Sequence, residues 1–352
     1  MSDIDPATES QTSDSIGALS QVLSGDPMAG LDADMKHVLD RLTDMGARPL
    51  ETLSPNLARR QPRAAEAISA ILGQQGRQRP DDGVEVEDIT IAGAEDELAG
   101  RVYRPVGLLS RLNPVVLYFH GGGFVTGDLD SHDLSARSIA RRTGAIVVSV
   151  AYRLAPEHRF PAAHDDAWAA WTWLTRNVSS LAGDPRRLAV AGEDAGANLA
   201  AHIALQARDA GRTQPVHQVL VHPIAGSDLT TASYGETLRL QPIGQPAMRW
   251  RFRQLFDQKA QADDPRIHLS TRQDLAGVAP ATIVLAGIDP LRSEGEALAE
   301  ALEHAGVPVN CWTYEGVTQG FFGLGLVVTK ALFAQSDTAD ALGKAFAPGR
   351  RS

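Results

Sequence analysis

A strand-to-helix turn around Asp194 has the residue types of a catalytic site. Residues 192–198 read GEDAGAN and follow the apolar run RLAVA, with Gly192 and Gly196 placed two residues either side of Asp194. Small residues at these positions allow a tight turn that holds the central side chain at the floor of a pocket, near a helix N-terminus. Since Asp is also a favoured helix N-cap, a purely structural role for Asp194 stays open.

A glycine-rich segment, HGGGF at 120–124, follows the apolar run PVVLYF. Consecutive glycines let the backbone approach a ligand and turn N–H groups into a pocket. Such N–H groups suit an oxyanion hole, which stabilises negative charge on an oxygen in the transition state. A flexible turn could use the same residues, but the position after a strand favours the oxyanion hole.

Two further segments lie closer to the C-terminus. Asp289 follows the apolar run ATIVLAG, and residues 314–321 read YEGVTQGF. Asp before Pro is a common helix start, so Asp289 could also be a cap. The order of turn, acid and final loop is nevertheless the order of the catalytic triad in α/β hydrolases.

Apolar periodicity indicates the elements that would position these segments. Short apolar runs predict strands at 114–119, 145–150, 187–192, 217–222 and 281–287. Helices are predicted between or after them at 131–142, 161–178, 195–209 and 292–305. Apolar strands alternating with helices are typical of a parallel sheet covered on both faces, whose sites lie at the carboxyl ends of the strands.

The N-terminal part has a different organisation. Residues 1–30 show no sustained period and are predicted to form a mobile tail. Apolar spacing then predicts a helix from Asp32 and a second helix over 63–72 that Gly73 ends. Alternation between residues 84 and 91 predicts half-buried strands, and residues 241–260 are interpreted as a helical insertion over the functional end of the sheet.

Composition narrows the function classes. The 352 residues carry 33 basic and 43 acidic side chains, a net charge of −10 that argues against a nucleic-acid partner. A single cysteine, Cys311, excludes an intrachain disulfide and a cysteine metal cluster. The first residues lack the features of a secretory signal, and no apolar run is long enough for a membrane span. We therefore predict a cytoplasmic location.

Five motifs in order carry a family resemblance: YFHGGGF, AYRLAPEHRFPAA, GEDAGAN, AGIDPLRSEGEALAEAL and YEGVTQGF. With them the sequence resembles the hormone-sensitive-lipase family of α/β hydrolases, the bacterial family IV carboxylesterases. The resemblance implies an α/β-hydrolase fold, with a mostly parallel eight-stranded sheet, helices on both faces and a helical cap. It extends over residues 31–346, with the cap at about 31–73 and 230–262, and leaves 347–352 as a C-terminal tail.

Two of the inherited triad positions depart from the family pattern. The resemblance places Asp194, Asp289 and Gln319 at the triad positions and implies oxyanion-hole donors at Gly122, Gly123 and Ala195. The family has Ser at position 194 and His at position 319, so only Asp289 matches. An amide cannot titrate, and none of the ten histidines lies in the loop that should supply the base. His120 belongs to the glycine loop, where the family uses it structurally.

These departures predict that ordinary serine-esterase activity is absent. We expect a non-hydrolytic enzyme in which Asp194 removes a proton next to a carbonyl while the glycine N–H groups hold the enolate. Elimination, isomerisation or cyclisation of a small, mostly apolar carbonyl compound would follow. The resemblance implies no metal or organic cofactor, and related proteins are often homodimers.

Three alternatives remain open at this stage. A dead triad could leave a small-molecule binder, as in the gibberellin receptor, which resembles the same family. Asp194 could instead be a nucleophile, as in haloalkane dehalogenases and epoxide hydrolases, although Gln319 would leave their water-activating histidine missing. Finally, both substitutions could have been engineered.

Overall fold

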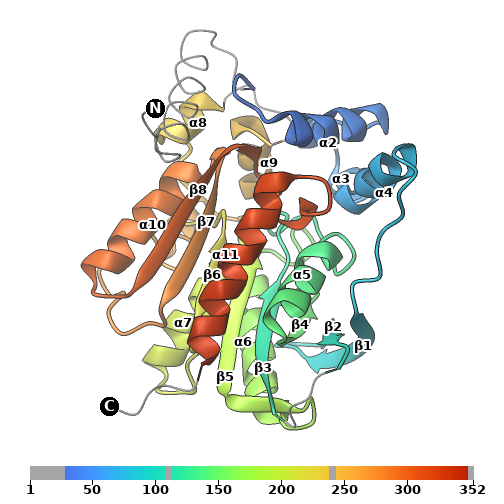
Figure 1. Cartoon of the computed structure of the whole chain (residues 1–352). Coiled ribbons are helices and arrows are strands. Elements are labelled where there is room, and N and C mark those ends of the chain that lie inside the picture. Colours follow the sequence, from blue (N-terminus) through green and yellow to red (C-terminus); the bar gives the residue numbers. More distant parts are fainter. Residues whose placement is uncertain (1–27, 108–111, 238–242, 348–352) are drawn as a thin grey trace, which may run out of the picture.

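An eight-stranded sheet forms the centre of the molecule (Figure 1). The computed structural model describes residues 28–107, 112–237 and 243–347. Strands follow the spatial order β1-β2-β4-β3-β5-β6-β7-β8. The pairs β1–β2 and β2–β4 are antiparallel, and every other neighbouring pair is parallel. The strands are β1 Val84–Ala92, β2 Glu97–Pro105, β3 Asn113–Phe119, β4 Ile146–Val150, β5 Gly183–Glu193, β6 Gln218–Val221, β7 Ala281–Ile288 and β8 Val309–Thr318.

Helices cover both faces of this sheet. Those whose buried residues share a core with one face are α6 Ala162–Asn177, α7 Ala195–Asp209 and α10 Arg292–His304. Those on the other face are α5 Asp133–Thr143 and α11 Thr329–Phe346. Alternate residues of β3 enter the two cores, Leu117 one and Val116 the other. The central strands are therefore almost continuously apolar, as the sequence predicted.

Further helices gather at one end of the sheet (Figure 1). We call four of them the cover helices: α2 Ala33–Asp44, α3 Pro55–Ala58, α4 Ala64–Gln74 and α9 Gln245–Leu255. The remaining helical segments are η1 Leu50–Thr52, α8 Ala232–Glu236, η2 Lys259–Asp263 and η3 Phe322–Leu324. These elements fall mostly within the predicted cap ranges, whose boundaries stay predictions.

The α/β-hydrolase fold and its predicted strands and helices are confirmed, with ends shifted by a few residues. Gly73 was wrongly predicted to end its helix, because α4 continues to Gln74 and the positive φ of 67° falls at Gly76. Alternation between residues 84 and 91 changes parity, so Val84 and Ile91 of the single strand β1 enter opposite cores. Most of the predicted N-terminal tail, 1–27, and most of the C-terminal tail, 348–352, lie outside the described residues.

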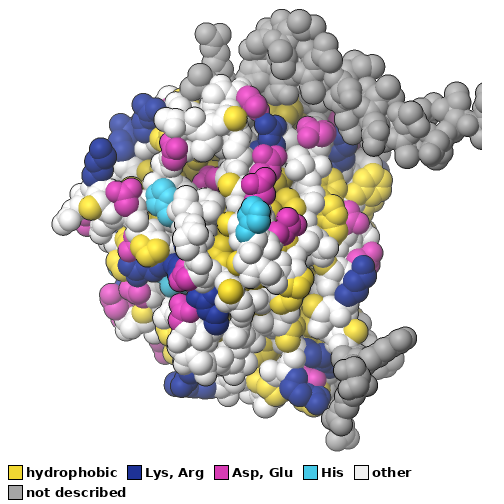
Figure 2. All heavy atoms as spheres, turned by 90° about the vertical axis from the view of Figure 1, so that its left-hand side faces the viewer, with side chains coloured by type: hydrophobic (Ala, Val, Ile, Leu, Met, Phe, Trp, Pro, Cys, Tyr) yellow, Lys and Arg dark blue, Asp and Glu magenta, His cyan; other side chains and the backbone are white. Residues whose placement is uncertain are grey.

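Two observations concern possible contacts with membranes and with charged partners. None of the helices in the described ranges is long and apolar enough to cross a membrane. On the face seen in Figure 2, acidic and basic side chains are interspersed instead of gathering into one basic patch.

Candidate active site

Asp194 occupies a strained turn between β5 and α7. Its backbone adopts φ 54° and ψ −114°, which is uncommon for a residue with a Cβ. A Cβ on Gly192 would collide with the Gly196 carbonyl, and one on Gly196 with the Phe119 carbonyl at the end of β3. The two glycines thus permit the close packing that projects Asp194 beyond the sheet. Ala195, the third predicted donor, begins α7 and is buried beside it.

The Asp194 carboxylate meets the glycine loop directly. Its Oδ2 accepts hydrogen bonds from the backbone N–H groups of Gly122 at 2.9 Å and Gly123 at 2.8 Å. The two N–H groups expected to hold a substrate oxygen therefore hold the protein's own carboxylate. The other oxygen, Oδ1, is buried and has no hydrogen-bond partner among the described residues.

A buried arginine completes the environment of Asp194. Arg251 of α9 places Nη1 3.2 Å from Oδ2, and both side chains are at most 4% exposed. A Cβ on Gly123, whose φ is +60°, would collide with the Arg251 side chain, so this approach requires glycine. The sequence interpretation missed Arg251. Its signal was periodic: residue 251 falls on the buried stripe formed by Met248, Phe252 and Leu255.

Asp289 and Gln319 also lie at this end of the sheet. Asp289 follows β7 and accepts the Leu291 backbone N–H through Oδ1 at 2.8 Å, while its Oδ2 has no partner within the described ranges. Burial raises the pKa of Asp289 to about 6. Gln319 follows β8, and neither its amide oxygen nor its nitrogen finds a partner in the described part of the chain. The structure thus brings both residues to the site without a hydrogen bond between them.

His222 is the second residue that the sequence interpretation missed. It follows β6 directly, with a φ of 34°, and its backbone N–H donates to the Val284 carbonyl at 2.7 Å. Its Nε2 accepts the Gly320 N–H at 3.3 Å and lies 3.7 Å from Oε2 of Glu193. The signal was its place at the end of a predicted strand, where parallel sheets form their sites.

Charge coupling sets the ionisation of this histidine. Burial alone would lower the pKa of His222, but the carboxylates of Glu193 and Asp289 outweigh it and raise the pKa above its usual value. Glu193 also accepts a 2.6 Å hydrogen bond from the Tyr118 hydroxyl. Burial would raise the pKa of Glu193, but the histidines at 222 and 132 outweigh it and lower this pKa.

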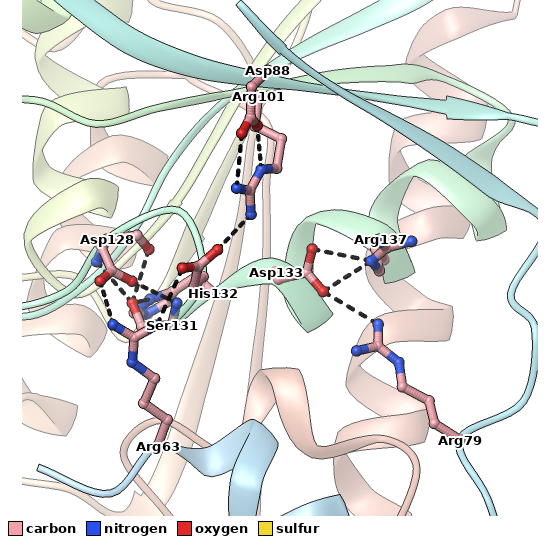
Figure 3. A network of polar contacts seen from close by, with 10 residues as sticks. Arg63, Arg79, Asp88, Arg101, Asp128, Ser131, His132, Asp133 and Arg137 are labelled. Atoms are coloured by element: carbon pink, nitrogen blue, oxygen red, sulfur yellow. Dashed lines mark hydrogen bonds and ion pairs between the residues drawn. The ribbon is translucent and has the colours of Figure 1, made fainter.

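A chain of polar contacts runs from the start of α4 through Asp128 and Ser131 to His132 (Figure 3), and from there to the glycine loop. Arg63, which precedes α4, pairs with Asp128 at 2.6 Å, and Asp128 accepts the Ser131 N–H at 2.8 Å. The Ser131 hydroxyl contacts His132 Nδ1 at 2.9 Å, and His132 Nε2 accepts the Gly121 N–H at 3.1 Å. The start of α4, one of the cover helices, is thereby linked to the loop that holds Asp194.

A cavity of about 1120 Å³ opens above these groups. Asp194, His222, Arg251 and Gln319 lie in its wall, together with apolar side chains of the cover helices such as Leu39. A largely apolar cavity with a few converging polar groups is typical of a small-molecule site. His120 is buried behind it, stacked on Tyr152 with ring centres 4.3 Å apart, which agrees with a structural role. Within the described ranges, no cluster of three acidic, histidine or cysteine side chains could hold a metal ion.

Comparison with known proteins identifies the class. A family model described as the alpha/beta hydrolase fold matches residues 116–323. The esterase LipI of Mycobacterium tuberculosis is 39% identical over 269 residues, which cover 76% of this chain and 84% of that protein. The ethyl acetate hydrolase of Pseudomonas putida is 35% identical over 289 residues, covering 80% and 88% respectively.

Solved structures agree with these relatives. The hyperthermophilic esterase of the archaeon Pyrobaculum calidifontis superposes with a TM-score of 0.80 at 35% identity, covering 89% of this chain and 98% of that one. The chain therefore belongs to the alpha/beta hydrolase fold family. Within it, the chain is a carboxylesterase-like member of the hormone-sensitive-lipase type.

Proposed function

We propose that this carboxylesterase-like protein is a non-hydrolytic enzyme that transfers protons on a small, mostly apolar carbonyl compound. The observation that carries the proposal is that the two carboxylate oxygens of Asp194 have different hydrogen-bond partners. Asp194 lines the cavity, and hydrogen bonds from two glycine N–H groups anchor its Oδ2, whereas its Oδ1 is buried and unpaired among the described residues. A buried unpaired carboxylate oxygen is costly unless a ligand or water completes it, so Oδ1 is the atom available to take a proton.

Serine-type hydrolysis does not suit this altered triad. Acyl transfer needs a hydroxyl nucleophile and an imidazole that takes and returns its proton. Position 194 offers a carboxylate and position 319 an amide. Elimination, isomerisation and cyclisation need neither of the missing groups, because a positioned carboxylate can remove the proton itself.

The substrate oxygen needs donors other than Gly122 and Gly123, which is a correction to the expectation that these hold the enolate. Unpaired donors in the wall of the same cavity include two that suit a carbonyl oxygen. They are Nε of Arg251 and Nε2 of Gln319, neither with a partner in the described part of the chain. A substrate carbonyl bound by these groups would have its adjacent C–H bond close to Asp194. The large apolar wall of the cavity favours a hydrocarbon-rich substrate.

The test measures proton removal without requiring the native substrate. Exchange of the α-protons of butanone for deuterium in D₂O is followed by proton NMR with the intact protein. We expect exchange above the buffer rate, and Asp194→Asn should slow it by about 10²- to 10⁴-fold, the usual contribution of a general base. The matched control is Asp184→Asn, which alters a buried carboxylate at the amino end of β5, the strand that leads to Asp194. Exchange that is absent, or equal in wild type and Asp194→Asn, would reject the proposal.

A second candidate is a ligand-binding protein without catalysis. This candidate is favoured because the Asp194 carboxylate already occupies the two glycine N–H groups that would otherwise stabilise a reaction intermediate. Mass spectrometry of the purified protein separates the candidates. An unchanged bound carbonyl compound without exchange activity would indicate a binder, and a covalent adduct on Asp194 after treatment with 1-bromobutane would indicate a nucleophile.

The cellular context completes the proposal. We infer a cytoplasmic homodimer from the sequence and its family resemblance. Sedimentation velocity and fractionation of the source cells test the two parts of this inference separately.

A further inference from the structure

We propose that His222 is the general acid of this site and protonates the group that leaves the substrate. The inference rests on the proposed function, in which Asp194 acts as the base. It assigns the role of a missing loop histidine to a residue at the end of a different strand. His222 follows β6, lies in the wall of the same cavity as Asp194, and is only 2% exposed.

Hydrogen bonding identifies the available ring nitrogen. Nε2 of His222 accepts the backbone N–H of Gly320, the residue after Gln319. In the neutral ring an accepting Nε2 leaves the proton on Nδ1. When the ring takes a second proton, Nε2 becomes a donor, gives up the Gly320 N–H and faces Oε2 of Glu193, 3.7 Å away. That Nδ1 is buried, and no described residue accepts its hydrogen bond. The site therefore contains an N–H donor that protein groups leave unpaired.

The surrounding charges favour the protonated ring. Glu193 on β5 lies 3.7 Å from Nε2, Asp289 follows β7, and Asp194 lies at the start of α7, all acting to stabilise an imidazolium. His132, which precedes α5, also interacts with Glu193 and opposes this effect when charged. The three carboxylates prevail, and the pKa of His222 lies above its usual value despite burial. One site thus holds an anchored carboxylate and an imidazole whose protonated form is stabilised, the arrangement that separates a base from an acid.

Asp194 as the base and His222 as the acid can together carry out an elimination. Asp194 Oδ1 takes the proton from the carbon next to the carbonyl, and the C–H electrons form a carbon–carbon double bond. The leaving hydroxyl departs with the electrons of its C–O bond, takes the Nδ1 proton of the protonated His222 ring and becomes water, which leaves the neutral ring with its proton on Nε2. A proton then returns from Asp194 to His222 through solvent, so the cycle needs no oxidant, metal or acyl intermediate.

The experiment uses 4-hydroxybutan-2-one, which loses water to give an unsaturated ketone detectable by ultraviolet absorbance. The intact protein is assayed for this elimination and, in D₂O, for exchange of the α-protons. His222→Gln should lower elimination by about 10²- to 10⁴-fold and exchange by much less, so the ratio of the two rates falls. His217→Gln is the matched control, because it removes the buried histidine at the opposite end of β6.

The outcomes separate the two proposals. Exchange with an unchanged elimination-to-exchange ratio in His222→Gln would overturn the role of His222 alone. Absence of exchange in the wild type would overturn the proposed function. NMR titration of His222 tests its proton affinity independently of any substrate: we expect a pKa above the usual histidine value, which Glu193→Gln lowers. A wild-type His222 pKa at or below the usual histidine value would overturn the inference.

Discussion

The two ends of β5 and β6 carry the same residue types in opposite environments. At the amino end of β5, both carboxylate oxygens of Asp184 accept from the guanidinium groups of Arg186 and Arg187. At the carboxyl end, Asp194 has one oxygen anchored and the other unpaired among described residues. A carboxylate with both oxygens paired stabilises the fold, while a buried carboxylate with one unpaired oxygen can still accept a hydrogen bond from a ligand.

The histidines flanking β6 repeat this contrast. His217 precedes the strand, contacts the Thr282 hydroxyl at 2.9 Å and has a pKa lowered to about 4 by burial. His222 follows the strand, and the carboxylates around it overcome burial and raise its pKa. Four strand residues separate the two histidines. His217 is a neutral core residue, whereas His222 lines the cavity and interacts with the surrounding carboxylates. Residue type alone therefore does not determine the role.

The largest expected effect tests whether the carboxyl end keeps its inherited machinery. Asp194→Ser with Gln319→His should produce hydrolysis of p-nitrophenyl acetate at least about 100-fold above either single variant, because triad residues act as a unit. Serine at 194 would also free the two glycine N–H groups for the oxyanion. Initial rates of the wild type, both singles and the double variant measure this. A folded but inert double variant would show that the cavity has been remodelled beyond these residues.

A second expected effect concerns the two sides of α9. Arg251→Met should destabilise the fold by about 3–5 kcal/mol, since it leaves a buried carboxylate without its cation. Arg249→Met on the exposed side of the same helix should change stability by less than about 0.5 kcal/mol. Urea unfolding monitored by circular dichroism gives both values. Equal effects would mean that Asp194 does not depend on the Arg251 charge.

The histidine pair predicts opposite pH dependences. Between its ordinary pKa of 6.5 and about 4, His217 stays neutral in the folded state while the unfolded chain binds a proton, so stability falls as pH falls. The raised pKa of His222 contributes stability that is fully present below 6.5 and is lost as pH rises through the folded value. His217→Gln should reduce the acid-side slope, by up to roughly 3 kcal/mol in total, and His222→Gln the alkaline-side slope. Urea midpoints from pH 4.5 to 8.5 measure both, and identical profiles would remove the contrast.

The smallest expected effect is at the surface of the same site. Arg63→Gln removes the ion pair between Arg63 and Asp128. The Arg63 side chain is 32% exposed and that of Asp128 is 45% exposed. Such pairs contribute about 0.2–1 kcal/mol, so the melting temperature should fall only slightly. A loss as large as that of Arg251→Met would show that the chain shown in Figure 3 transmits more than surface electrostatics.

The sequence by itself determined the fold class and the positions of the central elements. Apolar runs predicted β3 to β7 because a sheet covered on both faces must be apolar on both. Local motifs also singled out Asp194 and the glycine loop, because a tight turn and a close backbone approach each require particular small residues. Asp289 and Gln319 were singled out by their order along the chain and by the family resemblance. Gly73 was misjudged because a glycine can be tolerated inside an exposed helix end, where spacing alone does not locate the cap.

Only the tertiary structure decided what surrounds Asp194. Arg251 lies on a distant helix, and His222 ends a strand with no catalytic motif of its own. Their relation to Asp194 depends on how α9 packs over the sheet and on the carboxyl ends of β5 and β6 lying side by side. The occupation of the glycine N–H groups by the Asp194 carboxylate likewise depends on three-dimensional distances. The spacing of residues along a chain determines local turns and helix faces. The pairing of buried charges depends on contacts between segments that are far apart in the sequence.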